Sequence, residues 1–126
     1  MPSVIQKRFY NSVKVFWLNK ELLENRIWEA VKSLTLEHSE VNRVVLFGSV
    51  AHSRPTPASD IDILIIVDNC QERFLDRPLS FMRYFEGIGL GTDIFVYTNN
   101  EVVQGMTFVN AALKKGKVLF DKKHEE

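Results

Sequence analysis

Three aspartates have the residue type and spacing to hold divalent metal ions. Asp60 and Asp62 stand two residues apart around the start of the apolar run Ile61–Val67, and Asp93 lies near the start of a second run, Thr92–Tyr97. Side chains on a strand alternate between its faces, so Asp60 and Asp62 are expected on one side with Cα atoms roughly 7 Å apart. If the second run forms a neighbouring strand, the three carboxylates can converge on one or two Mg²⁺ ions. The alternative for Asp60 and Asp62 is a capping role at a loop end.

A glycine-serine pair that precedes these aspartates in the chain is typical of a phosphate-binding turn. Gly48 and Ser49 lie between an apolar run and a helical start. A glycine lets the backbone approach a phosphate, and the hydroxyl of Ser49 can donate a further hydrogen bond. Arg54, in the loop that follows, is either a phosphate contact or an exposed loop charge. Each motif is weak by itself, and the combination is more specific.

The elements that must position these residues alternate between helices and strands. Leu23, Ile27, Val31 and Leu34 recur at helical spacing, which predicts a helix over about Lys20–Leu36 with Asn19 as its N-cap. The remaining predicted elements are a strand over Val44–Phe47, a short helix ending near Ser53, a strand over Ile61–Val67, a helix across Arg73–Phe85, a strand over Thr92–Tyr97, a helix over about Asn100–Lys115 and an edge strand over Val118–Phe120. Within the helix across 73–85, Leu79 and Met82 are expected to share a face with Phe85 or Tyr84. This order predicts a layered α/β or α+β domain and argues against a helical bundle or a sandwich.

Composition excludes several classes of protein. The 126 residues carry 16 Lys plus Arg against 16 Asp plus Glu, so the formal net charge is zero and no extensive nucleic-acid surface is expected. No apolar run is long enough to cross a membrane. The single cysteine, Cys70, allows no internal disulfide, and together these features predict a cytoplasmic protein. Self-association stays open.

Length predicts a single domain over residues 1–126, with an uncertain N-terminal arm over 1–18. The segment Ser12–Leu18 alternates in a way that permits a short strand or an extended arm. The same region contains four aromatic residues that form either core or a partner surface: Phe9, Tyr10, Phe16 and Trp17.

These motifs resemble a known signature. Leu46–Ser49 followed by Ser59–Ile63 is similar to the signature of the DNA polymerase beta-like nucleotidyltransferase superfamily, and within it to the minimal nucleotidyltransferases. Thr92–Val96 and Lys117–Phe120 resemble the segments that carry the third carboxylate and the closing strand. The resemblance implies an α+β domain with a mixed sheet flanked by helices.

The resemblance also implies roles for individual residues. It assigns metal binding and catalysis to Asp60, Asp62 and Asp93, which would hold two Mg²⁺ ions. It assigns nucleotide binding, with ATP or another nucleoside triphosphate as substrate, to Gly48, Ser49 and Arg54. One departure is Ser53, which stands where many members carry glycine, so the loop from His52 to Ala58 is expected to differ in shape.

The resemblance finally implies a partner. Small members of this kind are encoded with helical HEPN-type toxins, and some act as antitoxins that transfer AMP from ATP to the partner. Because little chain follows the closing strand, the second substrate is expected to be small or to be supplied by another protein. The alternatives are a non-catalytic antitoxin or scaffold subunit and, less favoured, nucleotide transfer to a small molecule.

Overall fold

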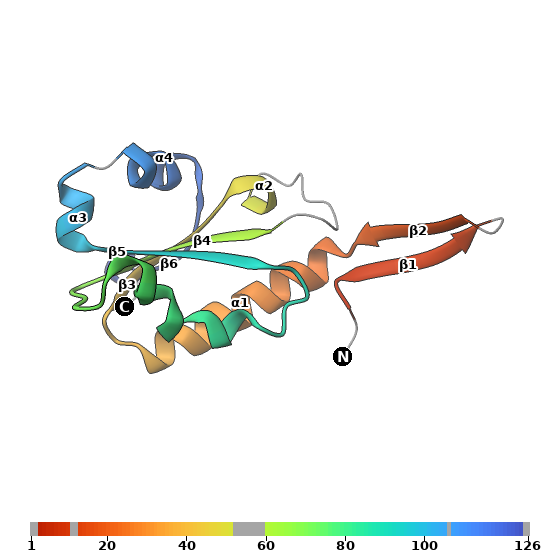
Figure 1. The fold of residues 1–126 in the computed structure, drawn as a ribbon, viewed down its shortest axis with the longest axis horizontal. Coiled ribbons are helices and arrows are strands. Elements are labelled where there is room, and N and C mark those ends of the chain that lie inside the picture. The colour runs from red at the N-terminus through yellow and green to blue at the C-terminus, as the bar shows by residue number, and fades with distance from the viewer. Residues whose placement is uncertain (1–2, 11–12, 52–59, 106, 125–126) are drawn as a thin grey trace.

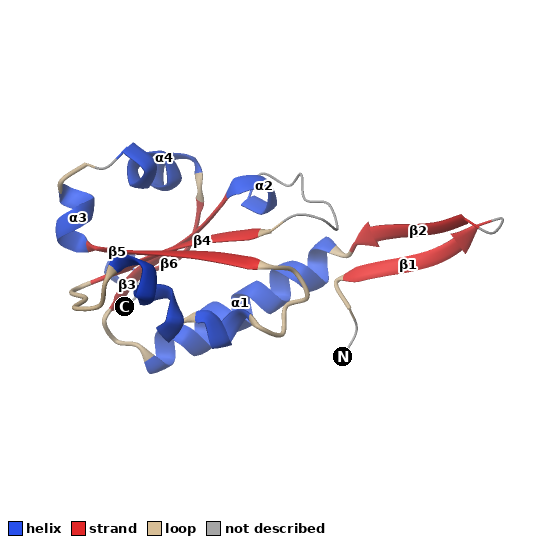
Figure 2. Ribbon diagram, viewed as in Figure 1, coloured by secondary structure: helices blue, strands red, loops and turns tan. Residues whose placement is uncertain are grey.

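A four-stranded mixed sheet forms the centre of the computed structural model, which describes residues 3–10, 13–51, 60–105 and 107–124 (Figure 1). The strand order is β5-β4-β3-β6. The strands are β3 (Val41–Phe47), β4 (Ile61–Val67), β5 (Thr92–Thr98) and β6 (Lys117–Asp121). β3 runs antiparallel to both β4 and β6, whereas β4 and β5 are parallel. Figure 2 shows helices on both faces, and the α+β class with a mixed sheet is confirmed.

The longest helix, α1 (Lys20–Glu37), covers one face of the sheet. Asn19 caps it as predicted, because its side-chain oxygen accepts a hydrogen bond from the backbone N–H of Leu22 at 3.1 Å. The predicted helical stripe is the buried one: Leu23, Ile27, Val31 and Leu34 are all at most 2% exposed. This stripe buries apolar surface against the sheet, which is the main favourable contribution to packing the two layers together.

The central strand β4 is buried on both faces. Ile61, Ile63 and Ile65 pack in the cluster formed with α1. Leu64 and Ile66 pack on the opposite face, in a cluster with residues of α4 (Thr107–Lys115). The alternation expected for this strand is therefore confirmed, and it carries Asp62 on the same face as Leu64.

Two predicted helices are each divided in the structure. The segment predicted as one helix over 73–85 forms two 3₁₀ segments, η1 (Phe74–Ser80) and η2 (Met82–Phe85). Pro78 lies inside the first and has no N–H to donate, which disfavours a continuous α-helix. The helix predicted over 100–115 forms α3 (Asn99–Val103) and α4, separated by the turn at Gln104–Gly105.

The apolar face predicted for residues 73–85 is confirmed at Phe85 and wrong at Leu79 and Met82. Leu79 and Met82 are 68% and 48% exposed, whereas Phe81, Phe85 and the following Ile88 are buried. The chain is interrupted at Phe81, which lies between the two 3₁₀ segments, so Leu79 and Met82 belong to different segments and do not continue one buried face.

An N-terminal β-hairpin extends away from the sheet (Figure 1). Its strands, β1 (Ile5–Tyr10) and β2 (Val13–Leu18), pair antiparallel with each other and with no other described strand. At its base, the backbone N–H of Asn19 donates to the carbonyl of Val4 at 2.7 Å, and Val4 is fully buried. Of the two forms that the sequence permitted for this segment, a short strand or an extended arm, the structure has the strand over Val13–Leu18. The side chains of the four aromatic residues lie outside the described part, so their packing stays a prediction.

Gly116 ends α4 and is expected to tolerate no larger side chain. Its N–H donates to the carbonyl of Ala112 at 2.8 Å. A Cβ there would lie 2.5 Å from both that carbonyl oxygen and Val45 Cγ1. We expect Gly116→Ala to lower the free energy of unfolding by about 1 to 3 kcal/mol through overpacking, as measured by urea denaturation. Gly87→Ala is the control, since a Cβ added to Gly87 would meet no atom within 4 Å and unchanged stability is expected there. Equal effects of the two substitutions would contradict the prediction.

Candidate active site

Two of the three predicted aspartates lie side by side on neighbouring strands. Asp62 and Asp93 are directly opposed in the parallel register of β4 and β5, so their side chains leave the same face of the sheet. The hypothesis of a shared metal site required the two strands to be neighbours, and β4 and β5 are paired in the sheet.

Asp60 lies just before β4 at the same end of the sheet. The N–H of Ile61 donates to the carbonyl of Gly91 at 2.8 Å, which joins this segment to the residues preceding β5. A Cβ added to Gly91 would come within 2.7 Å of Asp60 Oδ1. The absence of a side chain at Gly91 thus leaves room for the Asp60 carboxylate. Gly91 was not among the site residues predicted from the sequence, although its position two residues before Asp93 was a signal.

The electrostatics of this end of the sheet favour a cation. Burial raises the pKa of the Asp62 carboxyl, and the negative charges of Asp93 and Asp60 raise it further. Among the described residues, none of the ion pairs involves these three carboxylates. A bound cation would relieve both the desolvation and the mutual repulsion.

Gly48 adjoins this carboxylate cluster. Its φ is +76°, in the left-handed region that favours glycine, and a Cβ at this position would overlap Asp62 Oδ2. Phe47, the preceding residue, is paired with Asp62 across β3 and β4. Sequence analysis assigned this glycine to phosphate approach; the structure adds that it makes room for a carboxylate.

Two predicted nucleotide ligands, Ser49 and Arg54, lie partly or wholly outside the described part of the structure. Ser49 belongs to the short helix α2 (Gly48–Ala51), but its side chain lies outside the described part of the structure. Arg54 and Ser53 lie in 52–59, likewise outside the described residues. Their roles stay predictions.

Within the described ranges, no three Asp, Glu, His or Cys side chains are arranged closely enough to hold a metal ion. The donor set nevertheless fits a hard cation in its chemistry, since carboxylate oxygens are the ligands that Mg²⁺ prefers. Two carboxylates in register and a third nearby supply negative charge, and Asp60 and Asp93 are exposed.

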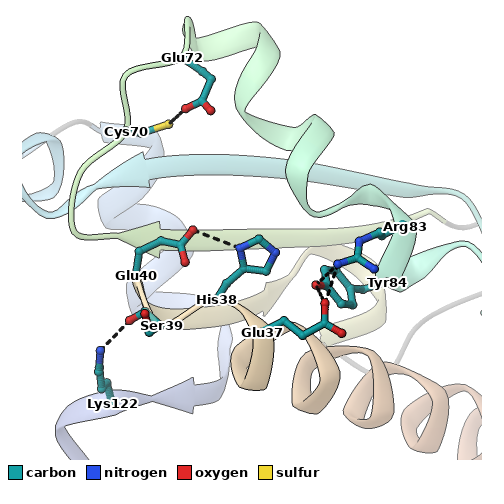
Figure 3. A network of polar contacts seen from close by, with 9 residues as sticks. All are labelled: Glu37, His38, Ser39, Glu40, Cys70, Glu72, Arg83, Tyr84 and Lys122. Carbon is teal, nitrogen blue, oxygen red and sulfur yellow. Dashed lines mark hydrogen bonds and ion pairs between the residues drawn. The ribbon is translucent and has the colours of Figure 1, made fainter.

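A separate polar network joins the C-terminal end of α1 to η2 (Figure 3). Glu37 accepts hydrogen bonds from the Tyr84 hydroxyl and the Arg83 guanidinium, and these two donors lower the pKa of its carboxyl. His38 lies 3.1 Å from Glu40 and packs beside Phe81. These contacts are typical of a packed surface residue. Among the described residues, His38 belongs to no group of side chains that could hold a metal ion.

Comparison with known proteins defines the family. Residues 29–125 match the family model for the polymerase beta nucleotidyltransferase domain, and the chain belongs to this family. The match includes all three aspartates and Gly48, and it begins after the hairpin, within α1.

Two solved structures share the fold. One is a candidate nucleotidyltransferase from Sulfolobus solfataricus, with a TM-score of 0.62 and 21% identity over 83% of this chain and 86% of that chain. The other is a toxin-antitoxin structure with AMP-PNP, with a TM-score of 0.55 and 20% identity over 78% of this chain and 73% of that chain. A search of curated proteins gave no significant match. None of the described helices is long and apolar enough to cross a bilayer.

Proposed function

We propose that this protein is a Mg²⁺-dependent nucleotidyltransferase that transfers AMP from ATP to a hydroxyl group of a partner protein. The hydroxyl oxygen bonds to the α-phosphorus, and the bond to the β-phosphate breaks to release pyrophosphate. The observation that carries the proposal is the register of Asp62 with Asp93 on adjacent parallel strands, next to a glycine that adjoins Asp62. Membership of the polymerase beta nucleotidyltransferase family supports the reaction class.

The chain's own residues divide the work of the reaction. Asp60, Asp62 and Asp93 would hold two Mg²⁺ ions, which would neutralise charge at the phosphates and lower the pKa of the acceptor hydroxyl. Asp93 is exposed and accepts the proton of the acceptor. Gly48 and Ser49 present backbone N–H groups to the triphosphate, and Arg54 adds a positive charge.

The partner is proposed to be a helical HEPN-type toxin, with this chain as the antitoxin. One structural neighbour is a toxin-antitoxin structure with AMP-PNP, which supports both a protein partner and an adenine nucleotide. The hairpin over residues 5–18 lies outside the family match and extends from the sheet, where a partner can reach it. The proposed location is the cytoplasm, where Cys70 stays reduced and ATP is available.

A second candidate is a non-catalytic antitoxin that acts by binding alone. It is favoured by one observation: the described carboxylates do not form a ready-made metal cluster. The two candidates differ in whether neutralisation of the toxin requires Asp60 and Asp62.

The test is transfer of label from α-labelled ATP. With Mg²⁺ and a co-encoded partner, the wild-type chain is expected to label the partner, and chelation by EDTA is expected to prevent labelling. The Asp60→Asn, Asp62→Asn double variant should give no label and no neutralisation of toxicity in cells. Asp76→Asn is the matched control, because the one ion pair of Asp76 within the described ranges is with the exposed Arg73, at 2.9 Å on η1. Full neutralisation of the toxin by the double variant would favour the non-catalytic candidate. Labelling of the partner by the double variant would contradict the proposed roles of Asp60 and Asp62 in catalysis.

A further inference from the structure

A small pocket opens beside the carboxylates, between α4 and the end of β3. Its volume is about 200 Å³. It is lined by Phe47, Gly48, Phe108, Ala111, Ala112 and Lys115. Gly48 both lines this pocket and adjoins Asp62, so the pocket and the candidate active site share a wall.

The pocket presents the aromatic ring of Phe108, which packs against the rings of Phe47, Phe95 and Tyr97. Phe108 is 40% exposed on α4. Its ring centroid lies 5.6 Å from that of Phe47, edge-on, and 5.1 Å from that of Phe95, tilted. Such pairs hold rings in place, so the exposed surface of Phe108 is a rigid apolar surface.

The supporting rings belong to the same strands as the carboxylates. Phe47 is paired with Asp62 across β3 and β4. Phe95 follows Asp93 by two residues on β5 and therefore lies on the same face. The strand pairing that places Asp62 opposite Asp93 therefore also places Phe47 and Phe95 beside these carboxylates.

We propose that this pocket binds the nucleobase of the substrate nucleotide, stacked against Phe108. The inference rests on the proposed function, and it identifies which part of the molecule selects a nucleotide over inorganic triphosphate. Every base has a π-face, and stacking on an aromatic side chain contributes about 1 to 3 kcal/mol per base. Lys115 lines the same pocket and brings a positive charge to its rim.

The lining also predicts how selective the site is. Its described side chains are aromatic or aliphatic except for Lys115, so they offer little hydrogen bonding to the edge of a base. Stacking without edge contacts discriminates weakly between bases. We expect Kd values for Mg²⁺ complexes of ATP and GTP that differ less than about tenfold, since both purines offer similar ring area.

The experiment is calorimetric titration of the full chain with Mg²⁺ and two probes, AMP-PNP and inorganic tripolyphosphate. Phe108→Ala is expected to raise the Kd for AMP-PNP about 5- to 100-fold and to leave that for tripolyphosphate unchanged. Phe74→Ala is the matched control. Phe74 is also 40% exposed, but its ring lies against Tyr97 at 5.1 Å and does not line the pocket.

A second variant keeps the test valid if Phe108→Ala fails to fold. Phe108→Leu retains an apolar side chain without a ring, and it is expected to weaken AMP-PNP binding in the same direction. Unchanged AMP-PNP affinity in the folded variants would overturn the inference while leaving the proposed function intact, as would equal losses for both probes. A wild-type chain that binds neither probe would overturn the proposed function itself, and the inference with it.

Discussion

Asp62→Asn is expected to reduce nucleotide transfer by about 100-fold or more while stabilising the metal-free protein. The first effect follows because the carboxylate is proposed to hold the metal ions, whose charge stabilisation amounts to several kcal/mol in such reactions. The second follows from the pKa of Asp62, which burial and its two acidic neighbours raise. A carboxyl group whose pKa is raised in the folded state opposes folding once it is charged.

The pH dependence of this stability difference has a definite sign. Below the ordinary pKa of an aspartate, Asp62 is protonated in both the folded and the unfolded chain, and wild type and variant are expected to be equally stable. The advantage of the variant should grow as the pH rises from that value through the raised pKa of folded Asp62, and it should be complete above it. The measurement is the melting temperature from circular dichroism across this pH range, with and without MgCl₂.

Magnesium provides the control for this prediction. MgCl₂ should raise the melting temperature of the wild-type chain, because a ligand that binds only the folded state stabilises it. It should do so far less for Asp62→Asn, whereas Asp76→Asn should respond like wild type. Equal stabilisation of wild type and Asp62→Asn by Mg²⁺ would contradict the assignment of Asp62 as a metal ligand.

Gly48→Ala is expected to damage both stability and transfer. The backbone at Gly48 has φ +76°, and the added Cβ would overlap Asp62 Oδ2, so either the loop or the carboxylate must move. We expect a loss of about 1 to 3 kcal/mol in the free energy of unfolding and a fall in transfer comparable to that of Asp62→Asn. Urea denaturation and the α-labelled ATP assay measure the two effects.

Gly105→Ala separates backbone strain from the collision. Gly105 has a similar φ of +74°, but the nearest atom to its added Cβ is Asn110 Nδ2 at 3.7 Å. This control should lose about 1 kcal/mol of stability and keep full transfer activity. If Gly48→Ala behaves in the same way, the collision with Asp62 is not what makes glycine necessary.

A double-mutant cycle tests the contact directly. Combining Gly48→Ala with Asp62→Ala removes the carboxylate that the new methyl group would overlap. The combined loss of stability should then be smaller than the sum of the two separate losses, because residues in contact are coupled. Additive losses would show that the two positions act independently.

The local features of this fold were predictable from the sequence. The isoleucine-rich run of β4, the N-cap of α1 at Asn19 and its buried stripe each depend on neighbouring residues and simple periodicity. The spacing of Asp60 and Asp62, together with Gly48 and Ser49, gave the family resemblance that the match over residues 29–125 confirmed. The α-helix predicted over residues 73–85 was wrong for a local reason as well, because Phe74–Ser80 forms a 3₁₀ segment with Pro78 inside it.

Spacing along the chain was enough to predict that Asp62 lies on the same face of β4 as Leu64, because side chains alternate along a strand. The position of Asp93 opposite Asp62 depends on the tertiary structure, because the parallel pairing of β4 and β5 joins residues far apart in the chain through hydrogen bonds that no local pattern encodes. The tertiary structure likewise brings Gly48 against Asp62 and Phe108 against Phe47 and Phe95. These contacts depend on how α4 and three strands pack in space, and that packing gives the candidate site both its acidic centre and its aromatic wall.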